Sequence, residues 1–199
     1  MNTIIEKALS QAVSYRDYRN YISEQISTDT NREENALLQY TVLNNSRMKR
    51  LDKTFQLDDE AKNTLEKLSK PMLWLVITEG WCGDAAQIVP VLDKIAAASP
   101  AIDLYFVYRD RNEDLMNLFL TNSKKAIPKL LALDKDTLEV VFTWGPRPEP
   151  ARDMVSKQLE TNGSLSADFK IELQQWYNTD RGASIVNEIL SLLRVAYPV

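Results

Sequence analysis

The sequence predicts an α/β fold in which a small mixed sheet is flanked by helices at both ends of the chain. Short apolar runs typical of strands fall between residues 72 and 143, whereas both flanking parts have the apolar spacing of amphipathic helices. In addition, the first two apolar runs are separated by a segment with helical spacing, which favours a parallel β-α-β unit.

Residues 1–70 are predicted to be entirely helical. Apolar spacing from Ile5 to Ile26 indicates a first helix, and the spacing from Arg32 to Lys53 indicates a second. Asp58 has the position of an N-cap for a short third helix, which the Lys70-Pro71 step ends because the residue before a proline disfavours helical backbone.

The middle of the chain carries the strands. Met72 to Thr78 (MLWLVIT) has the composition of a buried strand, and a helix follows it to about Ala98. The remaining predicted elements of the sheet region are a strand at 102–108, a short helix at 113–120, and a hairpin of strands at 129–133 and 138–143.

Helical spacing returns after a proline-rich exit at 144–150. The predicted helices cover about 151–159, 167–177 and 183–194. We therefore expect an N-terminal helical extension at 1–70, a sheet domain at 71–162 and C-terminal helices at 163–199, which together form one compact unit.

Composition narrows the classes of function. The net charge of −4 gives no global attraction to nucleic acid or to an anionic membrane, and no apolar run approaches the roughly 18 residues that a membrane-spanning helix needs. The N-terminal segment lacks the pattern of a secretory signal, and a single cysteine fits a reducing compartment, so we expect a cytoplasmic protein. Because histidine is absent, we expect no metal site, and we expect no cofactor.

The one cysteine lies in the segment Trp81-Cys82-Gly83-Asp84-Ala85, between the first strand and the following helix. A thiol at the N-terminus of a helix faces unpaired backbone N–H groups and the positive end of the helix dipole, and both favour the thiolate. The alternative is a buried cysteine that acts as a small hydrophobic side chain. The basic group Arg47, Lys49, Arg50 and Lys53 is predicted to be a solvated helix face, with the alternative that one of its arginines reaches the cysteine site.

Several pieces of the sequence, taken in order, resemble the thioredoxin fold. They are the Trp81-Cys82-Gly83 turn, Pro90 and the helical segment 91–96 behind it, and Ile127-Pro128 before the hairpin. The resemblance covers about residues 70–145, and the chain is most similar to uncharacterised bacterial thioredoxin-family proteins with a W-C-G-D-A motif.

This resemblance implies that Pro128 is in the cis form and faces Cys82 across a substrate groove. The backbone of Ile127 would then be available to pair with an extended partner. Lys129 directly follows the proline, so we expect its ammonium group to approach Cys82 and to lower the pKa of the thiol.

The departures from the family pattern bear on function. Ala85 occupies the position of the second cysteine, which in thioredoxins releases the substrate, so one chain cannot resolve a mixed disulfide by itself. Asp84 replaces the proline between the two cysteines. Val76 and Phe106 fall where family members have a buried aspartate and its lysine. The reaction cycle of a dithiol thioredoxin is therefore not expected.

Two functions from different classes stay open. In the first, Cys82 is the catalytic residue of thiol–disulfide exchange, with a disulfide-containing protein or a low-molecular-weight thiol as its partner. In the second, the protein is a non-catalytic module that binds a peptide or a small ligand in the groove, with Trp144-Gly145-Pro146-Arg147-Pro148 at its rim. The alternative role of Trp144 is to fill the core. Acid–base chemistry by Asp84 and Glu79 is a third hypothesis. The extra helices are expected to pack on the sheet, to cover the groove or to form a homodimer surface.

Overall fold

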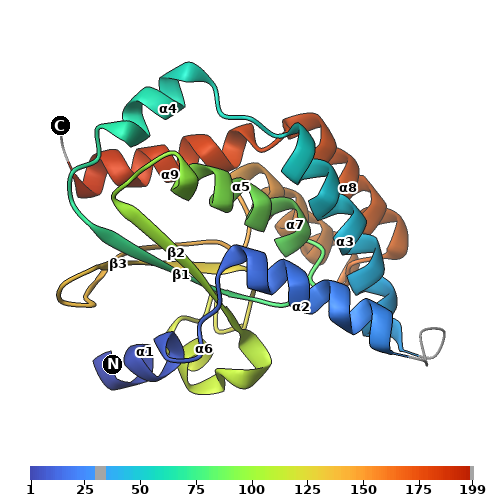
Figure 1. Ribbon diagram of the computed structural model, residues 1–199. Helices are drawn as coiled ribbons and strands as arrows, with labels where there is room; N and C mark the ends of the chain where they lie inside the picture. Colours follow the sequence, from blue (N-terminus) through green and yellow to red (C-terminus); the bar gives the residue numbers. More distant parts are fainter. Residues whose placement is uncertain (30–34, 198–199) are drawn as a thin grey trace.

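The computed structural model describes residues 1–29 and 35–197 (Figure 1). In chain order, the helices before the sheet are α1 (Asn2–Leu9), α2 (Tyr15–Thr28), α3 (Ala36–Thr54) and α4 (Asp59–Glu66). The predicted start of the second helix at Arg32 lies outside the described residues. The elements that follow are β1 (Met72–Thr78), α5 (Ala85–Ala97), β2 (Ile102–Tyr108), the 3-10 turn η1 (Arg109–Arg111), α6 (Glu113–Leu118), β3 (Lys129–Asp134) and β4 (Val140–Trp144). The C-terminal helices are α7 (Glu149–Asn162), α8 (Ala167–Asp180) and α9 (Ala183–Ala196).

The four strands form one mixed sheet in the order β2-β1-β3-β4. β1 pairs with β2 in parallel and with β3 in antiparallel, and β4 pairs with β3 in antiparallel. The parallel pair joined by α5 is the predicted β-α-β unit, and β3 with β4 is the predicted hairpin. The structure therefore confirms the α/β prediction.

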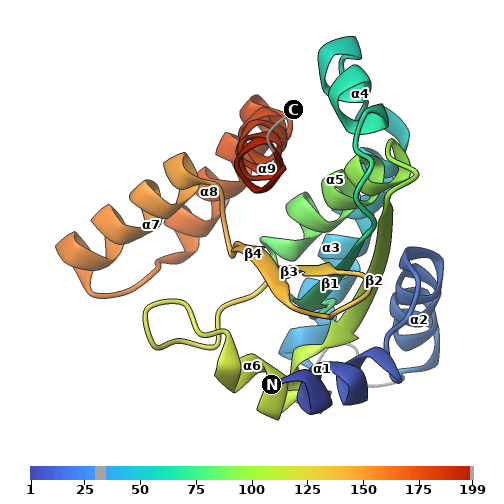
Figure 2. The same ribbon diagram turned by 90° about the vertical axis from the view of Figure 1, so that its left-hand side faces the viewer.

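Helices cover both faces of the sheet, with α5 and α9 on one face and α1 and α6 on the other (Figures 1 and 2). The first strand is the centre of the core, since Trp74, Leu75, Val76 and Ile77 are fully buried. No helix among the described residues is both long enough and apolar enough to cross a membrane.

Side-chain caps define where several helices begin. Asp58 accepts a hydrogen bond from the Ala61 N–H at 2.7 Å at the start of α4, as the sequence predicts. Ser166 accepts one from the Phe169 N–H at 3.1 Å and so caps α8. These local contacts explain why the helix starts after residues 58 and 166 could be predicted within one or two residues.

The predicted first helix is wrong in one respect, because the chain forms two helices there. Between α1 and α2, Val13 exchanges both backbone hydrogen bonds with Phe106 of β2, each at 2.9 Å. The backbone must be extended at Val13 to make this bridge, so the helix cannot continue through it. Val13 thereby covers part of the edge of the sheet, which apolar spacing alone does not reveal.

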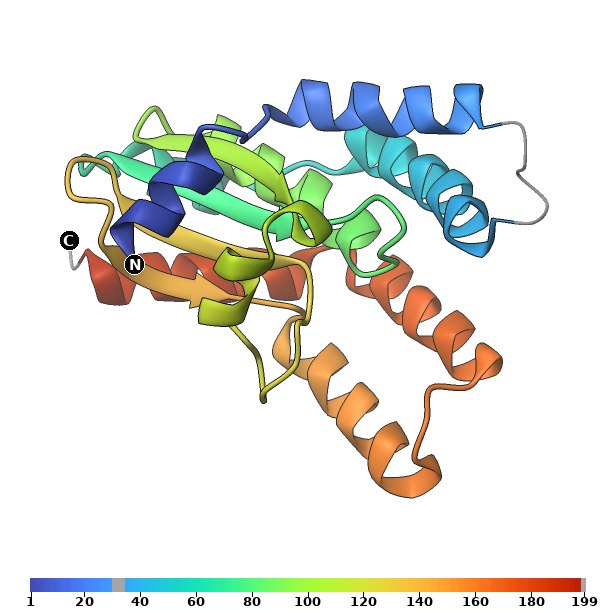
Figure 3. The same cartoon turned by 90° about the horizontal axis from the view of Figure 1, so that it is seen from below.

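Glu188 of α9 fixes the segment that leaves the sheet. Its carboxylate accepts hydrogen bonds from the Trp144 indole N–H at 2.7 Å and from the Glu149 backbone N–H at 2.5 Å. Trp144 is buried, in agreement with a core role. The start of α7 is therefore tied to α9, while α7 and α8 form a helical hairpin that extends from this point (Figure 3).

Candidate functional site

Cys82 lies in the turn between β1 and α5, where its own N–H donates to the Glu79 carbonyl at 3.2 Å. The side chain is buried, with 8% of the residue exposed. Its thiol donates to the Ile127 carbonyl, with a distance of 3.4 Å between Sγ and the oxygen. The Ile127–Pro128 peptide is cis. The structure thus brings Cys82 and the Ile127–Pro128 step together across 45 residues of sequence.

The surroundings of Cys82 favour the protonated thiol. Burial raises the pKa of the Cys82 thiol to about 12, and the Asp84 carboxylate also raises this pKa. The backbone N–H groups of Ala85 and Asp84 and the charge of Arg147 lower the pKa, but they do not offset burial. The helix N-terminus does stabilise the thiolate, as expected, but its effect on the pKa is smaller than that of burial.

Asp84 connects the cysteine turn to the C-terminal part of the chain. Its carboxylate accepts a hydrogen bond from Arg147 at 2.6 Å and another from the Tyr177 hydroxyl at 3.0 Å. The side chains of Asp84 and Arg147 are only 10% and 20% exposed. Burial and the neighbouring Asp84 raise the pKa of Tyr177, so this phenol stays a neutral donor. Asp84 is therefore more than a first-turn residue of α5.

The helices α3 and α8 lie on either side of the cysteine turn (Figure 3). From α8, Gln174 accepts a hydrogen bond from the buried Gln87 of α5 at 2.9 Å. From α3, Arg50 donates to the Gln87 side-chain oxygen at 3.3 Å. A Cβ atom added to Gly83 would lie 3.6 Å from Gln174 Nε2 and 3.8 Å from a guanidinium nitrogen of Arg47. Arg50 therefore reaches the first turn of α5 and Arg47 lies beside Gly83, in agreement with the alternative that an arginine of the basic group reaches the cysteine site.

Trp81 forms one side of the site and is covered by a cation. The Arg109 guanidinium lies over the indole ring, 4.7 Å from its centroid. Arg109 also donates to the Asp110 carboxylate at 2.8 Å and to the Lys125 carbonyl at 3.5 Å. Arg109 therefore links the Trp81 turn to the loop that leads into Ile127.

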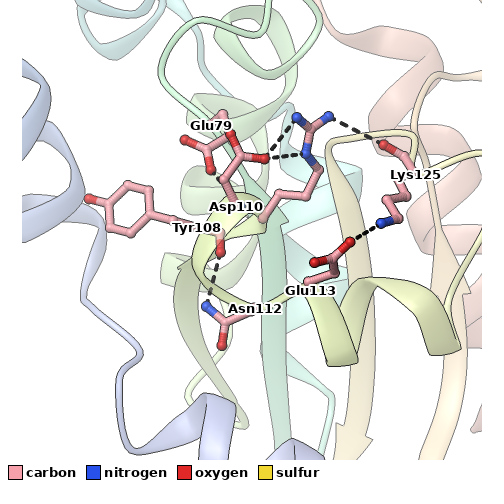
Figure 4. A network of polar contacts seen from close by, with 7 residues as sticks. Glu79, Tyr108, Asp110, Asn112, Glu113 and Lys125 are labelled. Carbon is pink, nitrogen blue, oxygen red and sulfur yellow. Dashed lines mark hydrogen bonds and ion pairs between the residues drawn. The ribbon is translucent and has the colours of Figure 1, made fainter.

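Around Arg109 the polar contacts continue into η1 and α6 (Figure 4). The Asp110 backbone N–H donates to the Glu79 carboxylate at 3.0 Å, and burial raises the pKa of Glu79. Lys125 forms an ion pair with Glu113, and the Asn112 side chain donates to the Tyr108 carbonyl at 2.9 Å. Glu79 and Asp84 are thus engaged by different partners, which gives no support to an acid–base pair.

The expectation that Lys129 approaches Cys82 is wrong, because its side chain is bound elsewhere. Its ammonium donates to the Thr121 hydroxyl at 3.2 Å, and burial lowers its pKa. The reason lies in the register of the sheet: Lys129 pairs with Ile77, whereas the next residue, Leu130, pairs with Val76. Successive side chains point to opposite faces of a sheet. Lys129 is therefore on the face opposite to Leu130, beside the loop before β3.

Val76 and Phe106 occupy the positions at which thioredoxins have a buried aspartate and its lysine, and both lie in apolar surroundings. Val76 and Phe106 are partners in the β1–β2 register, and both are fully buried. Ala85, at the position of the second cysteine, is also buried.

Arg147, Tyr177 and Gln174 contribute to the site without having been predicted. The sequence offered one hint, since the proline-rich exit that contains Arg147 was expected to border the groove. For Tyr177 and Gln174 no signal exists in the sequence, because their role depends on how the C-terminal hairpin folds back.

Comparison with protein families gives a match between residues 30–164 and the family described as thioredoxin. The chain belongs to the thioredoxin family. Among solved structures, a protein of unknown function from Pseudomonas aeruginosa (PA1234) is similar, with 19% identity, coverage of 93% of this chain and 99% of that chain, and a TM-score of 0.56. An HIV epitope scaffold is similar at 20% identity, with coverage of 93% and 100% and a TM-score of 0.56.

These two structures show a shared fold, and the comparison with curated proteins finds no match. Since both matches cover nearly the whole chain, the thioredoxin fold with additional helices at both ends is an arrangement that other proteins share. The single buried cysteine distinguishes this chain from a dithiol thioredoxin.

Proposed function

We propose that this thioredoxin-family protein binds an extended polypeptide at the Ile127–Pro128 step, with Cys82 as a neutral contact residue. The observation that carries the proposal is the buried thiol, which donates to the Ile127 carbonyl and whose pKa is raised to about 12. A thiol held in this state is a weak nucleophile, because the thiolate is the reactive form.

The backbone of Ile127 supports a role in polypeptide recognition. Its N–H group has no acceptor among the described residues. An unpaired N–H at the end of a loop can pair with the main chain of an extended segment, which is how strand addition gives affinity. Trp81 and Arg109, which lie beside the site, offer apolar and cationic contacts for the side chains of such a segment.

The proposal predicts that Cys82→Ser retains binding. A serine hydroxyl can donate to the same carbonyl, so the dissociation constant should change by less than about twofold. The probe is reduced, carboxymethylated lactalbumin, an extended chain without disulfides, titrated into ¹⁵N-labelled protein while the Ile127 amide signal is followed. An Ile127 amide that does not respond, with either the wild type or the variant, would contradict the proposal.

A second candidate is thiol–disulfide exchange by Cys82 alone, and its location at the start of α5 beside the Ile127–Pro128 step favours it. In this reaction the Cys82 thiolate attacks one sulfur of a partner disulfide. The S–S bond breaks, the second partner sulfur leaves as a thiolate, and a mixed disulfide remains. An external thiol must then resolve that disulfide, since the chain has no other cysteine. A cytoplasmic location would supply such thiols.

The pH dependence of Cys82 alkylation separates the two candidates. With a pKa raised to about 12, the thiolate fraction and hence the iodoacetamide rate should rise about tenfold per pH unit from pH 7 to pH 10 without a plateau. A rate that levels off below pH 8 would show a reactive thiolate and would favour exchange over the neutral contact.

A further inference from the structure

The helix α8 covers the residues that directly follow Cys82. Tyr177 and Gln174, one turn apart on α8, hold Asp84 and Gln87 by hydrogen bonds of 3.0 and 2.9 Å. Gln174 also lies beside Gly83. Three of the first residues after the cysteine are thus contacted by one face of a helix that is about 90 residues away in the sequence.

Apart from these polar contacts, α8 has a narrow apolar seam. Its buried residues are Phe169, Leu173 and Tyr177, which lie at four-residue spacing, and the half-buried Trp176 also packs against the core. By contrast, α9 buries Ile185, Val186, Ile189, Leu190 and Leu193. Since burial of apolar surface is the main favourable contribution to packing, α8 is held less firmly than α9.

The chain has left-handed backbone conformations before and after α8, where its direction can change. Gly163, at the end of α7, has a φ of 68° and no neighbouring atom within 4 Å of its Cβ position. After α8, Arg181 and Gly182 have φ values of 54° and 81°. Gly182 packs against Phe55 and Val91, at 3.0 and 3.1 Å from its Cβ position, so this end is fixed to the core.

We propose that α8 is a hinged cover over Cys82, latched by Tyr177 on Asp84 and by Gln174 on Gln87. The helix is fixed at Gly182, and α7 is fixed at its start by Glu188, so the hairpin between these points can move while α9 stays on the sheet. In the latched form the cysteine turn is shielded. Release of the latch uncovers the thiol and the turn around Gly83.

This inference deepens the proposed function, because a polypeptide that enters beside Cys82 would compete with α8 for the same turn. The identity of the ligand rests on the proposed function. The cover itself can be tested without any ligand, through the accessibility of the thiol.

The test is the rate of Cys82 alkylation by iodoacetamide at pH 9 in the full-length protein. Tyr177→Phe and Gln174→Ala each remove one latch contact without changing a charge near the thiol. We expect Tyr177→Phe to raise the rate roughly tenfold, since it removes a hydrogen bond to a carboxylate. The matched control is Gln175→Ala on the exposed side of α8, which should leave the rate unchanged. Equal rates in the wild type and both latch variants would overturn the proposal.

A second measurement uses the wild type, so it does not depend on whether a variant folds. Hydrogen exchange at the Leu173 amide of α8 should be at least about tenfold faster than at the Leu190 amide of α9, because α8 opens without unfolding of the core. Equal exchange rates at the two amides would also overturn the proposal that α8 is a hinged cover. If lactalbumin does not bind while the alkylation and exchange results hold, the proposed function fails and the cover stands.

Discussion

Replacing Asp84 with alanine is expected to lower the free energy of unfolding by about 3 kcal/mol, as is typical when one partner of a buried ion pair is removed. The carboxylate holds Arg147 at 2.6 Å and Tyr177 at 3.0 Å. Without it, the Arg147 guanidinium has lost its counter-charge while its Nε is already buried without a hydrogen-bond partner. Because Asp84 and Arg147 are 10% and 20% exposed, solvent screens this loss only in part.

The measurement is urea unfolding of Asp84→Ala beside Asp153→Ala, an exposed aspartate of α7. The control should change the free energy of unfolding by less than about 0.5 kcal/mol. Equal stability of the two variants would contradict the ion pair as a stabilising contact.

The same substitution should also change the chemistry of Cys82. The Asp84 charge raises the pKa of the thiol, so its removal lowers that pKa and increases the thiolate fraction at a given pH. Alkylation of Asp84→Ala should therefore be faster than that of the wild type at every pH between 7 and 10, and the loss of the Tyr177 contact to Asp84 acts in the same direction. If stability falls but the alkylation profile does not move, the carboxylate stabilises the fold without influencing the thiol.

Asp84 and Ala85, which stand where thioredoxins have a proline and the second cysteine, can both be explained by the way the C-terminal helices pack. A proline at position 84 could not accept the hydrogen bonds that Arg147 and Tyr177 donate to Asp84. A side chain at position 85 is buried, since Ala85 is 1% exposed, so a polar group there would need a hydrogen-bond partner inside the protein. The segment Asp84-Ala85 thus joins the cysteine turn to α8 on one side and to the core on the other. Its residues suit a covered turn better than an open dithiol site.

Much of the fold could be predicted because it depends on local patterns. The strands at 72–78 and 102–108 coincide with the predicted ranges, and the cap at Asp58 fixed a helix start. The bridge at Val13 could not be predicted, because its backbone pairs with a strand more than 90 residues away. Apolar spacing continues through Val13, and only the tertiary contact shows that the helix is interrupted there.

For the site, the sequence was sufficient to locate the cysteine turn and the proline that faces it, but not to predict the direction in which the pKa of Cys82 is shifted. The position at a helix N-terminus favours the thiolate and can be predicted from the sequence, whereas the burial that raises the pKa of Cys82 depends on the tertiary packing around the turn. Lys129 is a related case: proximity in sequence to Pro128 suggested contact with Cys82, but its side chain points to the face opposite to Leu130 and donates to Thr121.

Gly145→Ala, in the loop after β4, is expected to disrupt the site. A Cβ atom at Gly145 would lie 2.4 Å from the Pro128 carbonyl oxygen and 3.6 Å from Lys129 Cα. Gly145 also has a φ of 105°, which residues other than glycine rarely adopt. Backbone strain and forced contact each cost about 1–3 kcal/mol, so we expect a loss of about 3 kcal/mol in urea unfolding.

Gly163→Ala separates these two contributions, because Gly163 has a φ of 68° but no atom within 4 Å of its Cβ position. It should lose only about 1–2 kcal/mol, the cost of the left-handed conformation. In Gly145→Ala, the displaced atom belongs to the Pro128 backbone next to the Ile127 carbonyl that accepts the Cys82 thiol. The folded fraction of this variant should therefore show faster Cys82 alkylation, whereas Gly163→Ala should leave the alkylation rate unchanged. Equal losses of stability in the two variants would mean that the loop can move away from Pro128, and that the Ile127–Pro128 step is not held in place by Gly145.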